Sequence, residues 1–205
     1  PAGTYPASMV FQTCSDANAG INTATTADYT GIYNGSSGPR FNGLSANGFY
    51  IAGVYNASPS VGAAVLAINS VGRGNIQLSF QVSTLLAGNP ASLRLQYRPA
   101  SNNATWTDVP GPIEYVSNGS TSINATTFNV NLSNLIGAQI DNRPAFQLRW
   151  KYYRTSGTGA NDCAIAIDEI NINSQALPAP AISTGLVPAL SYCVTPTVPT
   201  PLVLP

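Results

Sequence analysis

The stretch Asn161-Asp-Cys-Ala-Ile-Ala-Ile-Asp-Glu-Ile-Asn-Ile172 decides the fold of this chain. In an extended strand Ile165 and Ile167 share one face, while Ala166 and Asp168 share the other, because successive side chains alternate. A carboxylate on such a strand must be hydrogen-bonded, paired or bound to a cation, because burying an unpaired charge is costly. We therefore interpret this stretch as the last strand of a β-sandwich.

The same period of two recurs along the chain. Polar and apolar residues alternate in Asn75–Ser83, Ser92–Arg98, Thr127–Ser133 and Ala145–Tyr153. Shorter candidate strands are Met9–Thr13, Phe49–Val54, Val61–Ile68 and Ile113–Val116. Alternation of this kind is typical of antiparallel strands with one wet face, and Leu132–Ile140 has room for one helical turn at most. The sequence thus predicts an all-β fold, a two-sheet antiparallel jelly-roll β-sandwich with an extended, proline-rich C-terminal tail.

Charge is scarce in this chain. Only 8% of the 205 residues are charged, against about 25% in a typical soluble domain, and the formal net charge is zero. Nothing therefore steers the protein toward nucleic acid or anionic membrane, and no apolar run reaches the length of about 18 residues that a membrane span needs. A surface of neutral polar side chains suits packing against copies of itself or against neutral polymers such as glycans.

Catalysis is not expected. The chain has no histidine, so neither a Ser-His nor a Cys-His nucleophile can be assembled. A pair of carboxylates, such as Glu114 with Asp108 or Glu169 with Asp141, is the one arrangement that a hydrolase could still use. No glycine-rich phosphate loop and no zinc-binding spacing occurs, and we predict no cofactor apart from a candidate structural Ca²⁺.

The three cysteines allow one disulfide. Cys14 follows the first candidate strand and Cys163 enters the last one, so a sandwich with neighbouring terminal strands would let them pair. Cys193 would then be free or bonded to another chain, although a bond from Cys193 to Cys14 or Cys163 is the competing connectivity. We expect an oxidising, secreted or cell-surface location, and no leader is visible because the chain opens with Pro1-Ala-Gly.

The character of the chain changes after Ile172. We assign residues 1–172 to the sandwich and residues 173–205 to a tail that is rich in proline and has no charge. Such a tail is either a linker or an apolar segment that docks on its own domain or on a neighbouring copy, as in donor-strand addition. The residues that would make the contact are Leu186, Val187, Leu190, Tyr192, Val194, Val198, Leu202, Val203 and Leu204.

Three segments carry a family resemblance. Ala164–Ile172 resembles the closing strand of MAM-type jelly rolls and of related concanavalin-like domains in secreted Bacteroidetes surface proteins. Phe146–Trp150 resembles the strand before it, and Ser92–Arg98 followed by Ala104–Val109 resembles a strand with a Trp hairpin. The resemblance implies the jelly-roll fold over residues 8–172 and a role in adhesion or surface display.

Asp168 has two interpretations. With Asp16, Asp162 or Glu169 it could bind Ca²⁺, which takes six to eight oxygen ligands. Alternatively, Asp168 caps a β-bulge by accepting backbone N–H groups.

A second candidate surface is basic and aromatic. Trp106, Tyr153 and Arg149 could bind a glycan, Arg149 being part of a stripe with Arg94, Arg98, Lys151 and Arg154. A solvated charged face, and a Trp106 ring folded back over the sandwich edge, are the competing interpretations.

Six Asn-x-Ser/Thr motifs are candidate glycosylation sites, at Asn34, Asn56, Asn103, Asn118, Asn124 and Asn131. Two functions are compatible with these features. The first is a secreted structural subunit that forms a filament, pilus-like fibre or surface layer with copies of itself by tail or strand exchange. The alternative is a glycan-binding or adhesive jelly-roll module.

Overall fold

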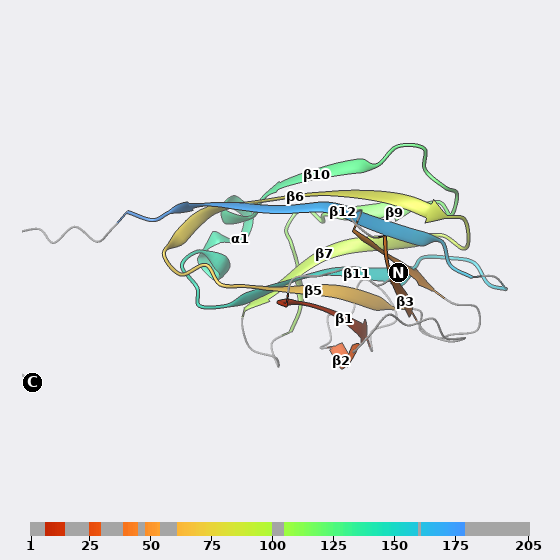
Figure 1. The fold of residues 1–205 in the computed structure, drawn as a ribbon, viewed down its shortest axis with the longest axis horizontal. Coiled ribbons are helices and arrows are strands. Elements are labelled where there is room, and N and C mark those ends of the chain that lie inside the picture. Colours follow the sequence, from red (N-terminus) through yellow and green to blue (C-terminus); the bar gives the residue numbers. More distant parts are fainter. Residues whose placement is uncertain are drawn as a thin grey trace, which may run out of the picture.

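The protein is an antiparallel β-sandwich of two sheets, as the sequence predicts (Figure 1). The computed structural model describes residues 7–14, 25–29, 39–44, 48–53, 61–99, 105–159 and 161–178. A seven-stranded sheet comprises β1 (Met9–Cys14), β2 (Thr25–Tyr29), β5 (Gly62–Ile68), β7 (Ala91–Pro99), β8 (Thr107–Asp108), β9 (Glu114–Ser117) and β11 (Phe146–Arg154). A five-stranded sheet comprises β3 (Pro39–Gly43), β4 (Phe49–Gly53), β6 (Arg73–Leu86), β10 (Thr126–Asn131) and β12 (Ala164–Ala176).

The strand order has the crossovers of a jelly roll. The seven-stranded sheet runs β2-β1-β5-β11-β7-β8, with β9 also paired to β7, and the five-stranded sheet runs β10-β6-β12-β4-β3. From β4 to β7, and again from β9 to β12, consecutive strands lie in opposite sheets. The last predicted strand is thus the central strand of its sheet, and it continues to Ala176 rather than ending at Ile172.

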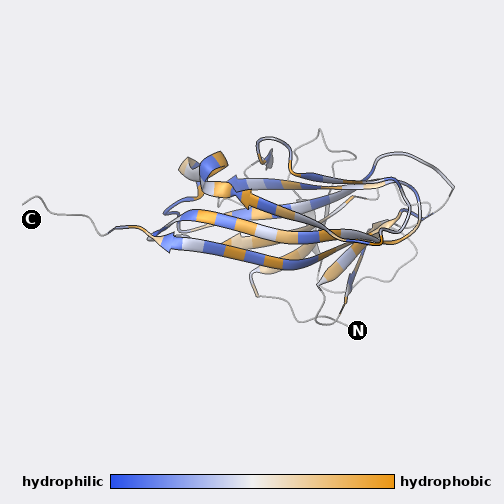
Figure 2. Cartoon of the chain, turned by 90° about the horizontal axis from the view of Figure 1, so that it is seen from above, coloured by the Kyte–Doolittle hydropathy of each residue, from blue (hydrophilic) through white to orange (hydrophobic). Residues whose placement is uncertain are grey.

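The core lies between the sheets and is built from the apolar residues of the alternating segments (Figure 2). Trp150 of β11 is fully buried and meets Phe80 of β6 edge-on, with 5.7 Å between ring centroids. Phe11 packs edge-on against Phe49 in the same way at 5.0 Å, which joins β1 to β4 across the sandwich. Edge-to-face aromatic pairs of this kind add specific geometry to apolar burial.

The helix at Leu132–Ile140 is longer than the single turn that the sequence predicts. α1 (Leu132–Ile140) has nine residues and lies beside β6 at one end of the sandwich (Figure 1). Asn131 caps it by accepting a hydrogen bond from the backbone N–H of Asn134 at 3.0 Å, which shortens the predicted strand that precedes it. Leu132, Ile136 and Ile140 are buried, although Ile136 has non-helical dihedral angles that kink the helix. The sequence predicts at most one turn here, because nine residues are too few to establish a helical period.

A β-bulge at Asp168 and Glu169 divides β12. Asp168 pairs with Gln81 of β6 and Asn171 pairs with Ser79, so three steps along β12 match two along β6. Glu169 has a φ of 49°, and its N–H donates to Asp168 Oδ1 at 2.7 Å. The structure therefore places Asp168 as the cap of a bulge.

The bulge also resolves a break in the apolar pattern. Ile165 and Ile167 are odd-numbered and fully buried, whereas Ile170 and Ile172 are even-numbered and pack against the same core. A strict period of two would send the second pair to solvent, because one extra residue changes the face of every side chain beyond it.

We predict that deletion of Asn171 destabilises the protein by about 2 kcal/mol, because removing one residue from the regular part of the strand turns Ile172 away from the core. Deletion of Glu169 removes the extra residue itself and leaves Ile165, Ile167, Ile170 and Ile172 in strict alternation toward the core, so this control variant is expected to stay within about 1 kcal/mol of the parent. Urea unfolding measures both, and equal stabilities for the two deletions would contradict the role of the bulge.

Candidate functional site

The outer face of the five-stranded sheet is a continuous array of amide and hydroxyl side chains. The strand register places Ser79 between Asn129 and Asn171, and Gln77 between Asn131 and Asn173. Directly opposed residues in antiparallel strands have Cβ atoms about 5 Å apart on one face, so each trio forms a row. We call this array, together with Gln81, Thr127, Tyr50 and Asn42, the polar sheet face.

The face continues over β4 and β3 with an aromatic residue. Tyr50 of β4 lies between Ala166 of β12 and Asn42 of β3, and Ser83 of β6 lies on the far side of Ala166. Phe49 and Ile51 point into the core, so Tyr50 points outward and is half-buried. The five strands of this sheet contain two basic residues, Arg40 of β3 and Arg73 at the start of β6.

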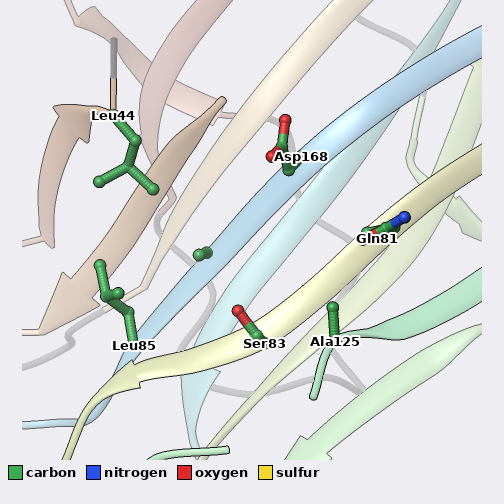
Figure 3. A pocket seen from close by; sticks show the side chains of 7 residues that line it. Leu44, Gln81, Ser83, Leu85, Ala125 and Asp168 are labelled. Carbon is green, nitrogen blue, oxygen red and sulfur yellow. The ribbon is translucent and has the colours of Figure 1, made fainter. Parts of the chain in front are cut away.

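A hollow of about 350 Å³ opens on this face above Ala166, whose small side chain leaves the space. Leu44, which follows β3, and Leu85 of β6 supply apolar groups, and Asp168, Gln81 and Ser83 supply polar groups (Figure 3). Ala125 completes the lining. The volume falls within the range of about 300 to 1,000 Å³ that small-molecule sites occupy.

Hydrogen bonds and one close backbone contact fix the positions of the groups around the hollow. Glu169 Oε2 accepts a hydrogen bond from Gln81 Nε2 at 2.6 Å, which orients the Gln81 amide. Gly48, with a φ of +78°, sits where a Cβ would collide with the carbonyl oxygen of Ile167, so only glycine lets β4 begin this close to β12. The N–H of Leu44 donates to the Gly48 carbonyl at 2.9 Å and closes the turn beside the hollow.

The residues predicted to bind Ca²⁺ are not brought together. Asp162 is buried near the start of β12, where its Oδ1 accepts hydrogen bonds from Arg154 and Asn89. Asp168 lies six residues along the chain on the outer face, about 20 Å away in an extended strand. Asp16 lies outside the described residues. Within the described ranges no group of three or more acidic, His or Cys side chains is placed to hold a metal.

The predicted basic and aromatic surface is covered rather than exposed. Trp106 and Arg149 are 0% exposed, and Tyr153 is 6% exposed. The guanidinium groups of Arg98 and Arg149 lie over the Trp106 ring, 4.3 and 4.6 Å from its centroid. The expectation of an accessible sugar-stacking surface at these residues is therefore corrected: the outer face of the seven-stranded sheet carries a second buried cluster, of Val61, Ala63, Val65, Trp106 and Tyr153.

The carboxylates of Asp108 and Glu114 do come together, on one arginine. Arg94 Nη1 lies 3.0 Å from Asp108, and Arg94 Nη2 lies 2.6 Å from Glu114. The Tyr153 hydroxyl donates to the other oxygen of Glu114. Burial, followed by this hydrogen bond, raises the pKa of Tyr153 to about 12. Both carboxylates are thus engaged in a structural network.

Cys163 is a buried, free thiol, so the predicted bond between Cys14 and Cys163 is wrong. Its Sγ donates to Ser117 Oγ at 3.5 Å, at the end of β9, which pairs with β7. From β7 to β1 the sheet crosses β11 and β5, or about 14 Å at the usual strand spacing, whereas a disulfide needs Cα atoms within about 7 Å. Burial raises the pKa of the Cys163 thiol.

Other predicted sites fall partly outside the described residues. Asn118 and Asn124 are exposed, and Asn131 is occupied as the helix cap through its Oδ1. Asn34, Asn56 and Asn103 lie outside the described ranges, as do Cys193 and the tail residues Leu186, Val187, Leu190, Tyr192, Val194, Val198, Leu202, Val203 and Leu204. Docking of the tail on another copy therefore stays a prediction, and so does a secreted location. Among the described residues, no helix has the length and apolar character to cross a membrane.

Sequence reasoning did not single out the polar sheet face. A signal was nevertheless present: the polar positions of Asn75–Ser83 and Thr127–Ser133 are amides and hydroxyls, whereas those of Ser92–Arg98 and Ala145–Tyr153 include arginine and lysine. The hollow had no such signal, because Leu44, Leu85 and Ala166 meet only through the strand register.

No protein family model and no curated protein matches the sequence. Solved structures with a similar arrangement include a family 11 carbohydrate-binding module from Clostridium thermocellum in complex with a β-1,3-1,4-mixed-linked tetrasaccharide. It is 11% identical, with a TM-score of 0.40 over 73% of this chain and 94% of that one. A family 30 carbohydrate-binding module is 10% identical, with a TM-score of 0.42 over 71% and 78% of the two chains.

A third similar structure is an enzyme domain. The enzymatically active domain of tailspike protein 4 of bacteriophage CBA120 is 12% identical, with a TM-score of 0.40 over 82% of this chain. The match spans 20% of the tailspike chain. All three TM-scores are below 0.5. The resemblance to MAM-type jelly rolls stays a prediction.

We predict that a maleimide leaves Cys163 unmodified in the native protein, because the thiol is buried and protonated. In denaturant without reductant, Cys163 is expected to react completely with the maleimide. A sample that is reduced beforehand is the control, and we expect the same extent of modification of Cys163. A peptide that joins Cys14 to Cys163 in a non-reducing digest would contradict the free thiol.

A pH dependence follows from Tyr153. Its folded pKa of about 12 lies above the ordinary value of 10, so the fold favours the protonated hydroxyl. Its contribution to the free energy of unfolding is complete below pH 10 and is lost as the pH rises to 12. We therefore expect Tyr153→Phe to cost about 1 kcal/mol at pH 8 and less at pH 11, measured by urea unfolding. A loss of stability from Tyr153→Phe that is as large at pH 11 as at pH 8 would contradict this network.

Proposed function

We propose that this protein is a glycan-binding β-sandwich module whose polar sheet face holds a polysaccharide chain. The observation that carries the proposal is the set of neighbouring rows of uncharged hydrogen-bonding side chains on β10, β6 and β12, which end at a hollow beside an aromatic residue. Most protein surfaces mix charged and polar groups, whereas these rows contain amides and hydroxyls almost throughout.

The chemistry of these side chains matches that of sugars. An amide offers a carbonyl acceptor and two N–H donors in one plane, and a hydroxyl offers one donor and two acceptor lone pairs. Sugar hydroxyl groups have the same dual character. Asn129, Asn171 and Asn173 are exposed, and Ser79 and Gln77 are half-buried between them, so the rows are accessible from solvent.

The dimensions and the aromatic residue also support a chain-like ligand. The outward residues of β6 from Gln77 to Ser83 span about 20 Å, which is long enough for several sugar units. Tyr50 gives an apolar ring surface with a polar tip, which suits the apolar face of a pyranose ring. Binding of this kind depends little on charge, as expected for a chain with a formal net charge of zero.

We expect Tyr50→Ala and Asn129→Ala each to weaken binding to a neutral polysaccharide by about fivefold, which corresponds to one lost contact of about 1 kcal/mol. The measurement is affinity electrophoresis in gels that contain hydroxyethylcellulose, mixed-linkage glucan, xylan or galactomannan. Gln139→Ala is the matched control, because Gln139 is exposed on α1 and away from the face.

Migration of the parent protein that no polysaccharide retards would refute the proposal. Retardation that Gln139→Ala weakens as much as the two face variants do would refute the assignment to this face. In the first case the self-assembly hypothesis, which concerns the tail, becomes the next one to test, and in the second case the glycan-binding surface has to be located elsewhere on the protein.

A further inference from the structure

We infer that the hollow selects uncharged glycan units over acidic ones, and that Asp168 and Glu169 determine this preference. The inference rests on the proposed function and concerns the same site. It assigns the ligand class as a neutral sugar unit that donates hydrogen bonds through its hydroxyl groups.

Two carboxylates give the hollow a negative charge. Asp168 lines it, and Glu169 reaches it through its hydrogen bond to Gln81. The ion pairs of the described residues include those of Arg94 with Asp108 and Glu114 and that of Arg154 with Asp162, whereas Asp168 and Glu169 take part in none of these. The hollow is therefore a local region of negative charge on a chain that is neutral overall.

The one cation on the neighbouring part of this face is too far away to compensate. Arg40 lies opposite Ala52, one row beyond the row of Tyr50 and Ala166, whereas Asp168 lies one row on the other side. Two rows along a strand cover about 13 Å, and two strand spacings across add about 10 Å. The resulting separation exceeds the Debye length of about 8 Å at physiological ionic strength, so Arg40 is largely screened from the hollow.

The hydrogen-bonding groups of the hollow that have no partner among the described residues are mainly acceptors. Asp168 Oδ1 already accepts from the Glu169 N–H, and one N–H of the Gln81 amide already donates to Glu169 Oε2. These bonds leave Asp168 Oδ2 and Gln81 Oε1 as acceptors, beside one amide N–H and the Ser83 hydroxyl, which can donate or accept. A sugar hydroxyl can donate to them, whereas the carboxylate of an acidic sugar would place acceptor against acceptor and negative charge against negative charge.

Apolar side chains form part of the wall of the hollow. Leu44 and Leu85 flank the hollow (Figure 3), and side chains of this kind exclude water from one side of a bound group. Electrostatic repulsion is stronger where the effective dielectric constant is below that of water. At contact distance one like-charge pair already costs about a fivefold loss of affinity in water.

The test uses one polymer in two forms. The neutral polysaccharide that retards the protein most is compared with the same polymer after oxidation of its primary alcohols to carboxylates, by affinity electrophoresis at low salt. We expect the parent protein to bind the neutral form about tenfold more tightly. For the Asp168→Asn/Glu169→Gln variant, which keeps both hydrogen-bond acceptors, we expect a difference of about twofold or less. Added salt should reduce the preference of the parent protein for the neutral polymer, because it screens the repulsion between carboxylates.

Two controls keep the outcomes separate. Asp141→Asn removes a negative charge at the end of α1, about 20 Å or more from the hollow along β6, and should keep the parent's preference. Equal binding of the two polymer forms by the parent, or an unchanged preference in the double variant, would overturn this inference and leave the proposed function intact. Failure of any neutral polymer to retard the parent would instead overturn the proposed function, and this inference with it.

Discussion

The bulge at Asp168 and Glu169 determines which side chains of the central strand reach the core and which reach solvent. Four isoleucines of β12 must pack against one core, yet two of them are odd-numbered and two are even-numbered. A single extra residue reconciles them, because it changes the face of all that follows. The same residue carries an exposed carboxylate next to that of Asp168, and a φ of 49° at Glu169 is the conformational cost. Packing of the core and chemistry of the surface thus depend on one local irregularity.

The two outer faces of the sandwich differ in a way that bears on function. The face of the seven-stranded sheet carries long cations, and there Arg149 and Lys151 are fully buried with Trp106. A guanidinium stacked on an indole ring keeps its charge over an electron-rich surface, which makes such burial tolerable. The face of the five-stranded sheet carries mainly short, neutral amides and hydroxyls, several of them exposed. Among the described residues, it is this second face that offers rows of hydrogen-bonding groups to a ligand from solvent.

Much of the fold could be predicted from alternation alone, because period two in Asn75–Ser83 or Ala145–Tyr153 admits few other structures. The bulge was one of two interpretations of Asp168, and the structure decides between them by packing odd- and even-numbered isoleucines of β12 against one core. The hollow and the state of Cys163 could not be predicted in this way, since both depend on which strands become neighbours. The burial of Trp106 and Arg149 was missed for a related reason: alternation assigns a residue to a face and does not say what covers that face.

The most direct test of the account is to map the binding surface by NMR, with backbone amide shifts recorded as a soluble neutral oligosaccharide is added. The account predicts that the shifted amides cluster on β6, β10 and β12, around Gln81, Asn129 and Asn171, and that those of Trp106 and Arg149 stay in place. Shifts confined to the seven-stranded sheet, or none at saturating oligosaccharide, would contradict it.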